Sequence, residues 1–146
     1  MKAKRSILYL DDESACVDVF QEMFCDEYDV RTVTTLSEAR RALEEPPADI
    51  VISDQRMPEI EGTEFLREVS ETRPASFRVM LTGSAMVSDV IKEISVGVVN
   101  LFVSKPWTEE GMRQTLERAG ASFELRDKAR RARAAQRTGA PVPNAA

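Results

Sequence analysis

The sequence predicts a doubly wound α/β fold, in which a five-stranded parallel sheet lies between two layers of helices. Short apolar runs alternate with amphipathic stretches along most of the 146 residues, as they do in chains built from βα units. A hydrophobic content of 42% at this length suits one domain with a single core. Right-handed crossovers between parallel strands then place helices on both faces of the sheet.

The predicted strands are short runs rich in apolar and β-branched residues. They span residues 6–10, 29–33, 49–53, 78–82 and 99–103. Between them, apolar residues recur at the spacing of one helical face. The four stripes are Cys16, Val19, Phe20 and Met23; Leu36, Ala39 and Leu43; Phe65, Leu66 and Val69; and Val87, Val90, Ile91 and Ile94.

A fifth helix is expected after Pro106, with Thr108 as its N-cap. Its apolar stripe consists of Met112, Leu116, Ala119 and Phe123. The same phase then continues with arginines, which oppose a coiled coil and are expected to form a solvated face. We therefore predict a domain over residues 1–122, followed over 123–146 by a helical extension to about Arg133 and a disordered tail or linker.

Charge and composition exclude several classes of function. Residues 1–108 carry 12 Lys and Arg against 20 Asp and Glu, and this acidic body disfavours nucleic-acid binding. The absence of histidine excludes a phosphohistidine carrier and a histidine-ligated metal site. No apolar run reaches the roughly 18 residues that span a bilayer. Cys16 and Cys25 suit buried thiols in a reducing compartment, so we expect a cytoplasmic protein.

Polar residues cluster at the ends of the predicted strands. Asp11 and Asp12 follow the first strand, Asp54 the third, Thr82 ends the fourth and Lys105 follows the fifth. Because parallel strands end at one edge of a sheet, these side chains are expected to converge there. Several carboxylates favour a Mg²⁺ ion, and a lysine favours a phosphate oxygen. The set predicts phosphoryl transfer to a carboxylate.

The segments "LDDE", "SDQRMPEIEG", "LTG" and "FVSKPW" resemble the CheY-like receiver domain of response regulators in two-component signalling. The resemblance covers roughly residues 5–120 and implies a flavodoxin-like sheet of order 2-1-3-4-5. It implies that Asp54 is the phosphoacceptor. Asp12 would bind Mg²⁺ directly, Asp11 through water, and Arg56 through its backbone carbonyl.

The resemblance also implies roles for residues around the acceptor. Thr82, Gly83 and Lys105 would contact the phosphoryl group, and Phe102 would be the switch aromatic. Three further positions match residues that shape the family's loops: Pro58, Gly62 and Pro106, the last commonly after a cis peptide.

The implied partner is a histidine kinase or phosphotransfer protein, and the chain itself would not be an enzyme beyond its own phosphorylation and dephosphorylation. Signalling would use the face of the fourth helix, fifth strand and fifth helix, through a homodimer or an output domain outside this chain.

Three alternatives compete with this interpretation. A receiver fold can serve as a docking module without phosphorylation. A haloacid-dehalogenase-like phosphatase also forms an aspartyl phosphate, but it needs a second Asp where this chain has Arg56. A flavodoxin-like nucleotide binder needs a phosphate-binding loop after the first strand, where this chain has acids that repel phosphate.

Overall fold

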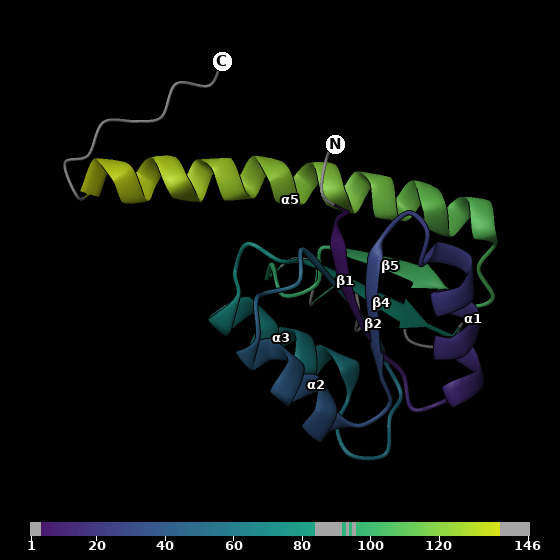
Figure 1. Ribbon diagram of the computed structural model, residues 1–146. Coiled ribbons are helices and arrows are strands. Elements are labelled where there is room, and N and C mark those ends of the chain that lie inside the picture. Colours follow the sequence, from purple (N-terminus) through teal and green to yellow (C-terminus); the bar gives the residue numbers. More distant parts are fainter. Residues whose placement is uncertain (1–3, 84–91, 93, 95, 138–146) are drawn as a thin grey trace.

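The protein, described here by a computed structural model, folds around a five-stranded parallel sheet (Figure 1). The structure describes residues 4–83, 92, 94 and 96–137. The strands are β1 (Ser6–Leu10), β2 (Asp29–Val33), β3 (Ile50–Asp54), β4 (Phe77–Thr82) and β5 (Leu101–Ser104). Their order is β2-β1-β3-β4-β5, which confirms the predicted fold class and strand order.

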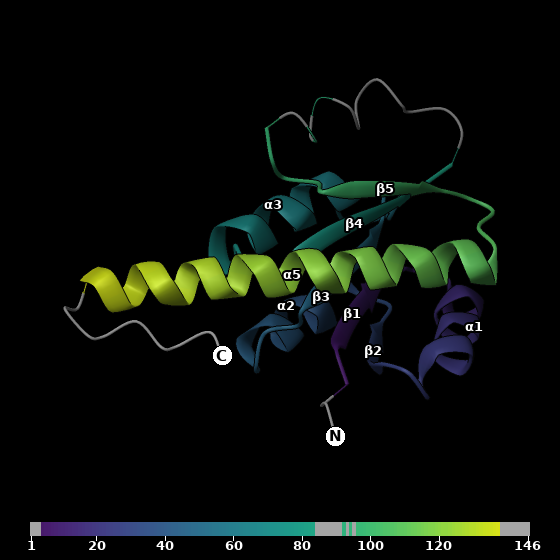
Figure 2. The ribbon, with the colours of Figure 1, turned by 90° about the horizontal axis from the view of Figure 1, so that it is seen from above.

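Helices cover both faces of this sheet. The helices are α1 (Ser14–Phe24), α2 (Leu36–Glu44), α3 (Gly62–Thr72) and α5 (Glu109–Arg137). The first and last lie on one face, and α2 and α3 lie on the other (Figures 1 and 2). The helix predicted from the stripe at 87–94 lies largely outside the described residues.

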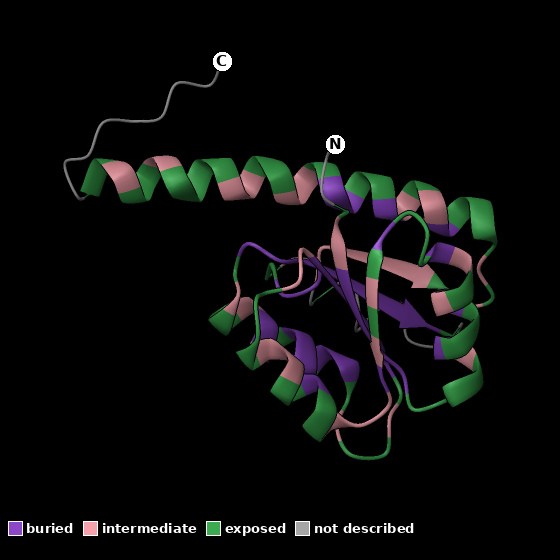
Figure 3. Ribbon diagram, viewed as in Figure 1, coloured by how far each residue is buried: buried purple, intermediate pink, exposed green. Residues whose placement is uncertain are grey.

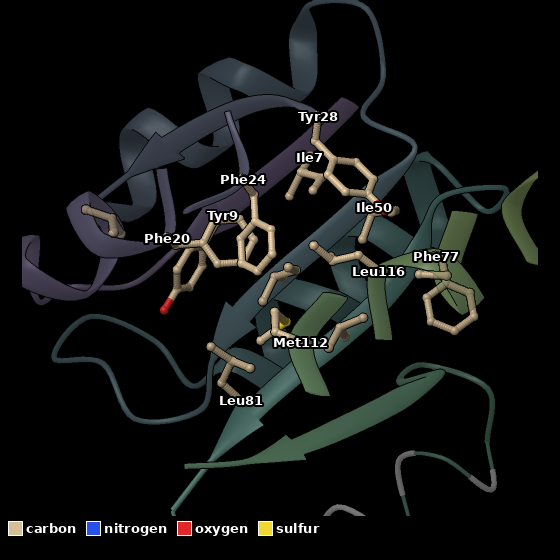
Figure 4. Packing of buried hydrophobic residues seen from close by; sticks show 14 residues of the cluster. Ile7, Tyr9, Phe20, Phe24, Tyr28, Ile50, Phe77, Leu81, Met112 and Leu116 are labelled. Carbon is tan, nitrogen blue, oxygen red and sulfur yellow. The ribbon is translucent and has the colours of Figure 1, made fainter. Parts of the chain in front are cut away.

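Two apolar clusters fill the space between the layers. Successive residues of each strand face opposite sides of the sheet, so Tyr9 packs on the side of α1 and α5, and Leu8 packs on the side of α2 and α3. Figure 4 shows the first cluster, in which aromatic rings from α1 pack beside Tyr9. Burial is highest in the central strands β3 and β4 (Figure 3).

The buried face of α1 differs from the predicted stripe. The structure buries Val17, Phe20 and Phe24, and leaves Val19 48% exposed. Both stripes have helical spacing, but the second brings two phenylalanine rings together at a centroid distance of 4.9 Å, so it buries more apolar area. The expectation of buried thiols was also wrong, because Cys25 is exposed and Cys16 is only half-buried.

Strand limits shift slightly from the predicted ones. Strand β3 begins and ends one residue later, so Asp54 is its last residue. Asp49 stays outside the strand because it exchanges hydrogen bonds with Ser6: its backbone N–H donates to Oγ of Ser6, and its carboxylate accepts from the Ser6 N–H. Strand β4 starts one residue earlier than predicted, and β5 starts later and is shorter.

Helix α5 is the longest element and projects beyond the sheet (Figure 2). Thr108 caps it as predicted, since its Oγ1 accepts the Gly111 N–H at 3.0 Å. The helix ends at Arg137, past the predicted end near Arg133, and runs without a break across the expected domain limit at residue 122. The predicted disordered tail begins outside the described residues. Among the described helices, none combines the length and apolar character that a membrane span requires.

Candidate functional site

Three carboxylates meet at the carboxyl ends of the neighbouring strands β1 and β3. Oxygen atoms of Asp11, Asp12 and Asp54 all lie within 4.8 Å of one another. Asp11 is fully buried and Asp54 is only 8% exposed, whereas Asp12 is open to solvent. The three acids therefore lie together at one edge of the sheet, as their places at the ends of the strands predicted.

Lys105 reaches this cluster from the segment after β5. Its Nζ lies 2.8 Å from Oδ1 of Asp54 and 3.4 Å from Oδ2 of Asp11. Its backbone N–H donates to the Thr82 carbonyl at 2.9 Å, and its peptide bond to Pro106 is cis, as the family resemblance implied. One ammonium group thus contacts two of the three carboxylates.

Burial and the neighbouring charges shift the pKa values of Asp54 and Lys105. Burial raises the pKa of Asp54 above its usual value, and the charges of Asp11 and Asp12 raise it further, although Lys105 opposes the shift. Burial lowers the pKa of Lys105, but its hydrogen bond to Asp54 and the charge of Asp11 outweigh that effect, so the net shift is upward. The lysine therefore remains charged beside its two acceptors.

Tyr9 fixes Asp11, and this residue was absent from the predicted site. Its hydroxyl donates to Oδ2 of Asp11 at 2.7 Å, while the Glu13 N–H donates to Oδ1 at 3.0 Å. Burial and the bond to Asp11 raise the pKa of Tyr9 far above its usual value, so the hydroxyl keeps its proton. A period of two along β1 places residues 9 and 11 on one face of the sheet, and this signal could have identified the pair.

The loop after Asp54 depends on a close approach at Gly62. A Cβ there would lie 2.3 Å from the backbone oxygen of Asp54, so only glycine fits. Gln55 ties the same loop to α3: its carbonyl accepts the Gly62 N–H at 3.0 Å, and its Oε1 accepts the Thr63 N–H at 3.1 Å. These contacts position the start of α3 against the acceptor.

The remaining predicted residues lie around the cluster without joining it. Thr82 is buried at the end of β4, but its hydroxyl donates to the Gly83 carbonyl at 2.9 Å and not to an acid. Phe102 pairs with Met80 in the β4–β5 ladder and packs against the α2 and α3 cluster. Two further predicted residues of the loop after β3 are exposed: Arg56 and Pro58.

The donor atoms of the cluster fit a hard divalent cation. All are carboxylate oxygens, the ligand type that Mg²⁺ prefers, and the single lysine balances one of three carboxylate charges. Asp12 is exposed, and Lys105 contacts only one oxygen of Asp54, so both could bind a metal directly. Both oxygens of Asp11 already accept hydrogen bonds, which suits a contact through water.

Comparisons with known proteins agree with this geometry. The model of the family described as the response regulator receiver domain matches residues 7–117. A curated relative, the hydrogenase transcriptional regulatory protein HoxA of Cupriavidus necator, is 31% identical over 94% of this chain, which spans only 28% of that protein. The transcriptional regulatory protein GlrR of Escherichia coli is 27% identical over 77% of the chain and 26% of its own length.

Solved structures show the same fold. A response regulator receiver domain protein from Clostridium thermocellum superposes with a TM-score of 0.77 at 27% identity, covering 83% of this chain and 98% of that one. The chemotaxis protein CheY4 of Vibrio cholerae, at 24% identity, superposes with a TM-score of 0.73 over 80% of this chain and 99% of that one.

Proposed function

Because the chain belongs to the response regulator receiver family, we propose that it is a phosphorylation-controlled switch whose Asp54 accepts a phosphoryl group from a histidine kinase or phosphotransfer protein. One observation carries the proposal. The Asp54 carboxylate lies at the sheet edge, 2.8 Å from Lys105 and beside two further acids. Such a site supplies a nucleophile, a cation for the phosphoryl oxygens and ligands for a metal.

The side chains divide the work of the transfer. One oxygen of the Asp54 carboxylate forms the new bond to phosphorus, while Lys105 lies beside the carboxylate at 2.8 Å from Oδ1. The bond between phosphorus and the donor's nitrogen or oxygen breaks, and the leaving group takes a proton from solvent. Lys105 then pairs with a phosphoryl oxygen as a point charge. When Mg²⁺ is bound, it neutralises the charge that the carboxylates and the phosphoryl group share.

The response is proposed to follow the pattern that the resemblance implies. The Thr82 hydroxyl, now bonded to the Gly83 carbonyl, would turn to a phosphoryl oxygen, and Phe102 would repack. Such a change needs only a few kcal/mol of differential contact. The altered face would include β5 and α5 and would serve a homodimer or an output domain beyond this chain. The two regulators HoxA and GlrR are about four times as long as the matched segment, which supports an output outside it.

Intact-mass measurement with acetyl phosphate and Mg²⁺ tests the proposal. The full chain should gain one phosphoryl group, and Asp54→Asn should gain none. Asp18→Asn, which removes an exposed acid from α1, is the matched control and should behave as the wild type. An adduct that forms equally well on Asp54→Asn would refute the assignment of the acceptor, whereas a wild type that gains no phosphoryl group would favour the docking-module alternative.

The phosphatase alternative is weaker on structural grounds. Its acid–base aspartate would stand at residue 56, where the chain has an exposed arginine. An arginine stays protonated and cannot accept a proton from an attacking water. We therefore propose a phosphoacceptor of the cytoplasm and not a hydrolase.

A further inference from the structure

We propose that the Tyr9 hydroxyl is a positioning group that sets the geometry of Asp11 and, through it, the balance of Lys105 between Asp11 and Asp54. The inference rests on the proposed function of the acid site. It assigns a role to a core residue two positions before the first acid. The hydroxyl acts through Asp11 and Lys105 and does not contact a phosphoryl group.

Three donors share the two oxygens of Asp11. The Glu13 N–H holds Oδ1 at 3.0 Å, and the Tyr9 hydroxyl holds Oδ2 at 2.7 Å. Lys105 lies at 3.4 Å from the same Oδ2, the longest of these contacts. Its contact with Asp54 is shorter, at 2.8 Å. The tyrosine thus occupies the position on Oδ2 that the lysine would otherwise take.

Burial and aromatic packing hold the tyrosine ring in this position. It is fully buried, and the Phe20 ring packs against it edge-on with centroids 4.9 Å apart. Phe20 also contacts Phe24 and Trp107, at centroid distances of 4.9 and 6.2 Å. Figure 4 shows Tyr9, Phe20 and Phe24 side by side. Since Trp107 follows Lys105 by two residues, one aromatic cluster supports both the tyrosine and the lysine segment.

Removing the hydroxyl should change two properties of the site. Oδ2 of Asp11 would keep Lys105 as its donor, so the lysine should move toward Asp11 and away from Asp54. Asp11 would also lose one of the two bonds that fix its plane, and carboxylates around a metal depend on such outer bonds. Loss of an outer partner of this kind weakens metal affinity by about 10-fold or more.

The test compares Tyr9→Phe with Tyr28→Phe in the full chain. Both residues are buried in the same aromatic-rich cluster, but only the Tyr9 hydroxyl bonds to the acid site. Mg²⁺ titration followed by NMR should show about 10-fold weaker binding for Tyr9→Phe and unchanged binding for Tyr28→Phe. A crystal structure of metal-free Tyr9→Phe should show Nζ of Lys105 closer to Asp11 than to Asp54.

A third measurement separates the two effects. With saturating Mg²⁺, Tyr9→Phe should still be phosphorylated by acetyl phosphate more slowly than the wild type. Saturation removes the effect of weaker Mg²⁺ binding, but Lys105 remains displaced. Unchanged Mg²⁺ affinity together with an unchanged Lys105 position would overturn the inference. Failure of the proposed function would look different: the wild type would take up no phosphoryl group, while the metal-free structures would still show whether Tyr9 controls Lys105.

Discussion

The two ends of the sheet handle buried charge in opposite ways. At the carboxyl ends, which we call the acid end, three carboxylates lie together and Lys105 contacts two of them, Asp11 and Asp54. At the amino ends, which we call the arginine end, Arg78 and Arg126 bond to neutral oxygens. Helix α5 passes both, starting beside the acid end and projecting past the arginine end (Figure 2).

At the arginine end, backbone carbonyls satisfy the buried guanidinium group of Arg78. Its side chain is 5% exposed and donates four hydrogen bonds to backbone carbonyls. The acceptors belong to the segments before β4 and β5: Pro74, Ser76, Gly97 and Val98. Burial lowers the pKa of Arg78 to about 10, and the nearby charge of Arg126 adds to the shift, yet the group stays protonated at neutral pH.

The contrast separates structural charge from functional charge. Arg78 has its donors matched by carbonyls, so it stabilises the fold and offers nothing to a ligand. The acid end has more negative charge than its lysine balances, which is costly without a cation. Buried charge that the protein leaves unbalanced indicates a functional site, and five experiments on substituted proteins can break or sharpen this distinction.

The largest expected effect is the loss of stability when Arg78 is replaced. Arg78→Met removes four hydrogen bonds and leaves buried carbonyls without donors, so the free energy of unfolding should fall by at least about 3 kcal/mol. Urea denaturation measures the change. Arg31→Met is the matched control, because Arg31 pairs with Glu45 on the surface, and its loss should cost less than about 1 kcal/mol. Similar costs for the two variants would contradict the assignment of Arg78.

The second effect belongs to the acid end and concerns Mg²⁺. At 100 times its dissociation constant, Mg²⁺ should stabilise the wild type by about 2.7 kcal/mol. Asp54→Asn should lose most of this gain, since it removes a carboxylate from the cluster. Thermal melts with and without Mg²⁺ give the comparison, and an equal gain for both proteins would exclude Asp54 as a ligand.

Without metal, the difference in the free energy of unfolding between Asp54→Asn and the wild type should depend on pH. Burial raises the folded pKa of Asp54 above its ordinary value, so the neutral carboxyl favours the folded state. This contribution is fully present below the unfolded pKa and is lost as the pH rises through the folded value. The stability of Asp54→Asn relative to the wild type should therefore increase as the pH rises above about 4. Urea titrations across this range would contradict the shift if the difference stayed constant.

Two glycines give a third, smaller contrast. Gly62→Ala should cost about 2 kcal/mol, because the new Cβ would lie 2.3 Å from the Asp54 backbone oxygen. Gly120→Ala in the middle of α5 would place its Cβ 3.4 Å from the flexible Arg5 side chain, so helix propensity should raise stability by about 1 kcal/mol. Urea denaturation of both variants checks the opposite signs.

The acid end could be predicted from sequence, and the arginine end could not. The carboxyl ends of parallel strands lie at one edge of a sheet, so the acids and the lysine that follow those strands in the sequence must lie close together. The partners of Arg78 are backbone carbonyls of two loops, and carbonyls carry no sequence signal. Tyr9 was missed because an aromatic residue inside a strand is ordinarily read as core, which it also is.

Helix α5 shows the same limit. Three residues of its predicted apolar stripe are buried, Met112, Leu116 and Ala119, and the fourth, Phe123, is partly buried against the same cluster. Its arginines were expected to be solvated, but Arg126 packs over the Phe77 ring and bonds to Asn100, which are distant in sequence. The limit between domain and extension at residue 122 remains a prediction.

The smallest expected effect tests whether Arg126 anchors the extension. Its guanidinium carbon lies 5.2 Å from the Phe77 ring centroid, and its Nη1 donates to Oδ1 of Asn100 at 3.0 Å. Arg126→Gln should cost about 1 kcal/mol through the lost cation–π contact and hydrogen bond.

The loss should be local, because the apolar stripe that precedes Arg126 still packs on the sheet. Hydrogen exchange should therefore accelerate over residues 127–137 and stay unchanged in β4, since the last turns of a helix that projects from a domain fray when a nearby anchor is lost. Arg131→Gln is the control, because Arg131 pairs with its helical neighbour Asp127 at 3.0 Å on the surface, and such pairs contribute about 0.3–0.5 kcal/mol. Equal exchange in the two variants would mean that residues 127–137 stay helical without the contacts of Arg126, and would overturn its role as an anchor of the extension.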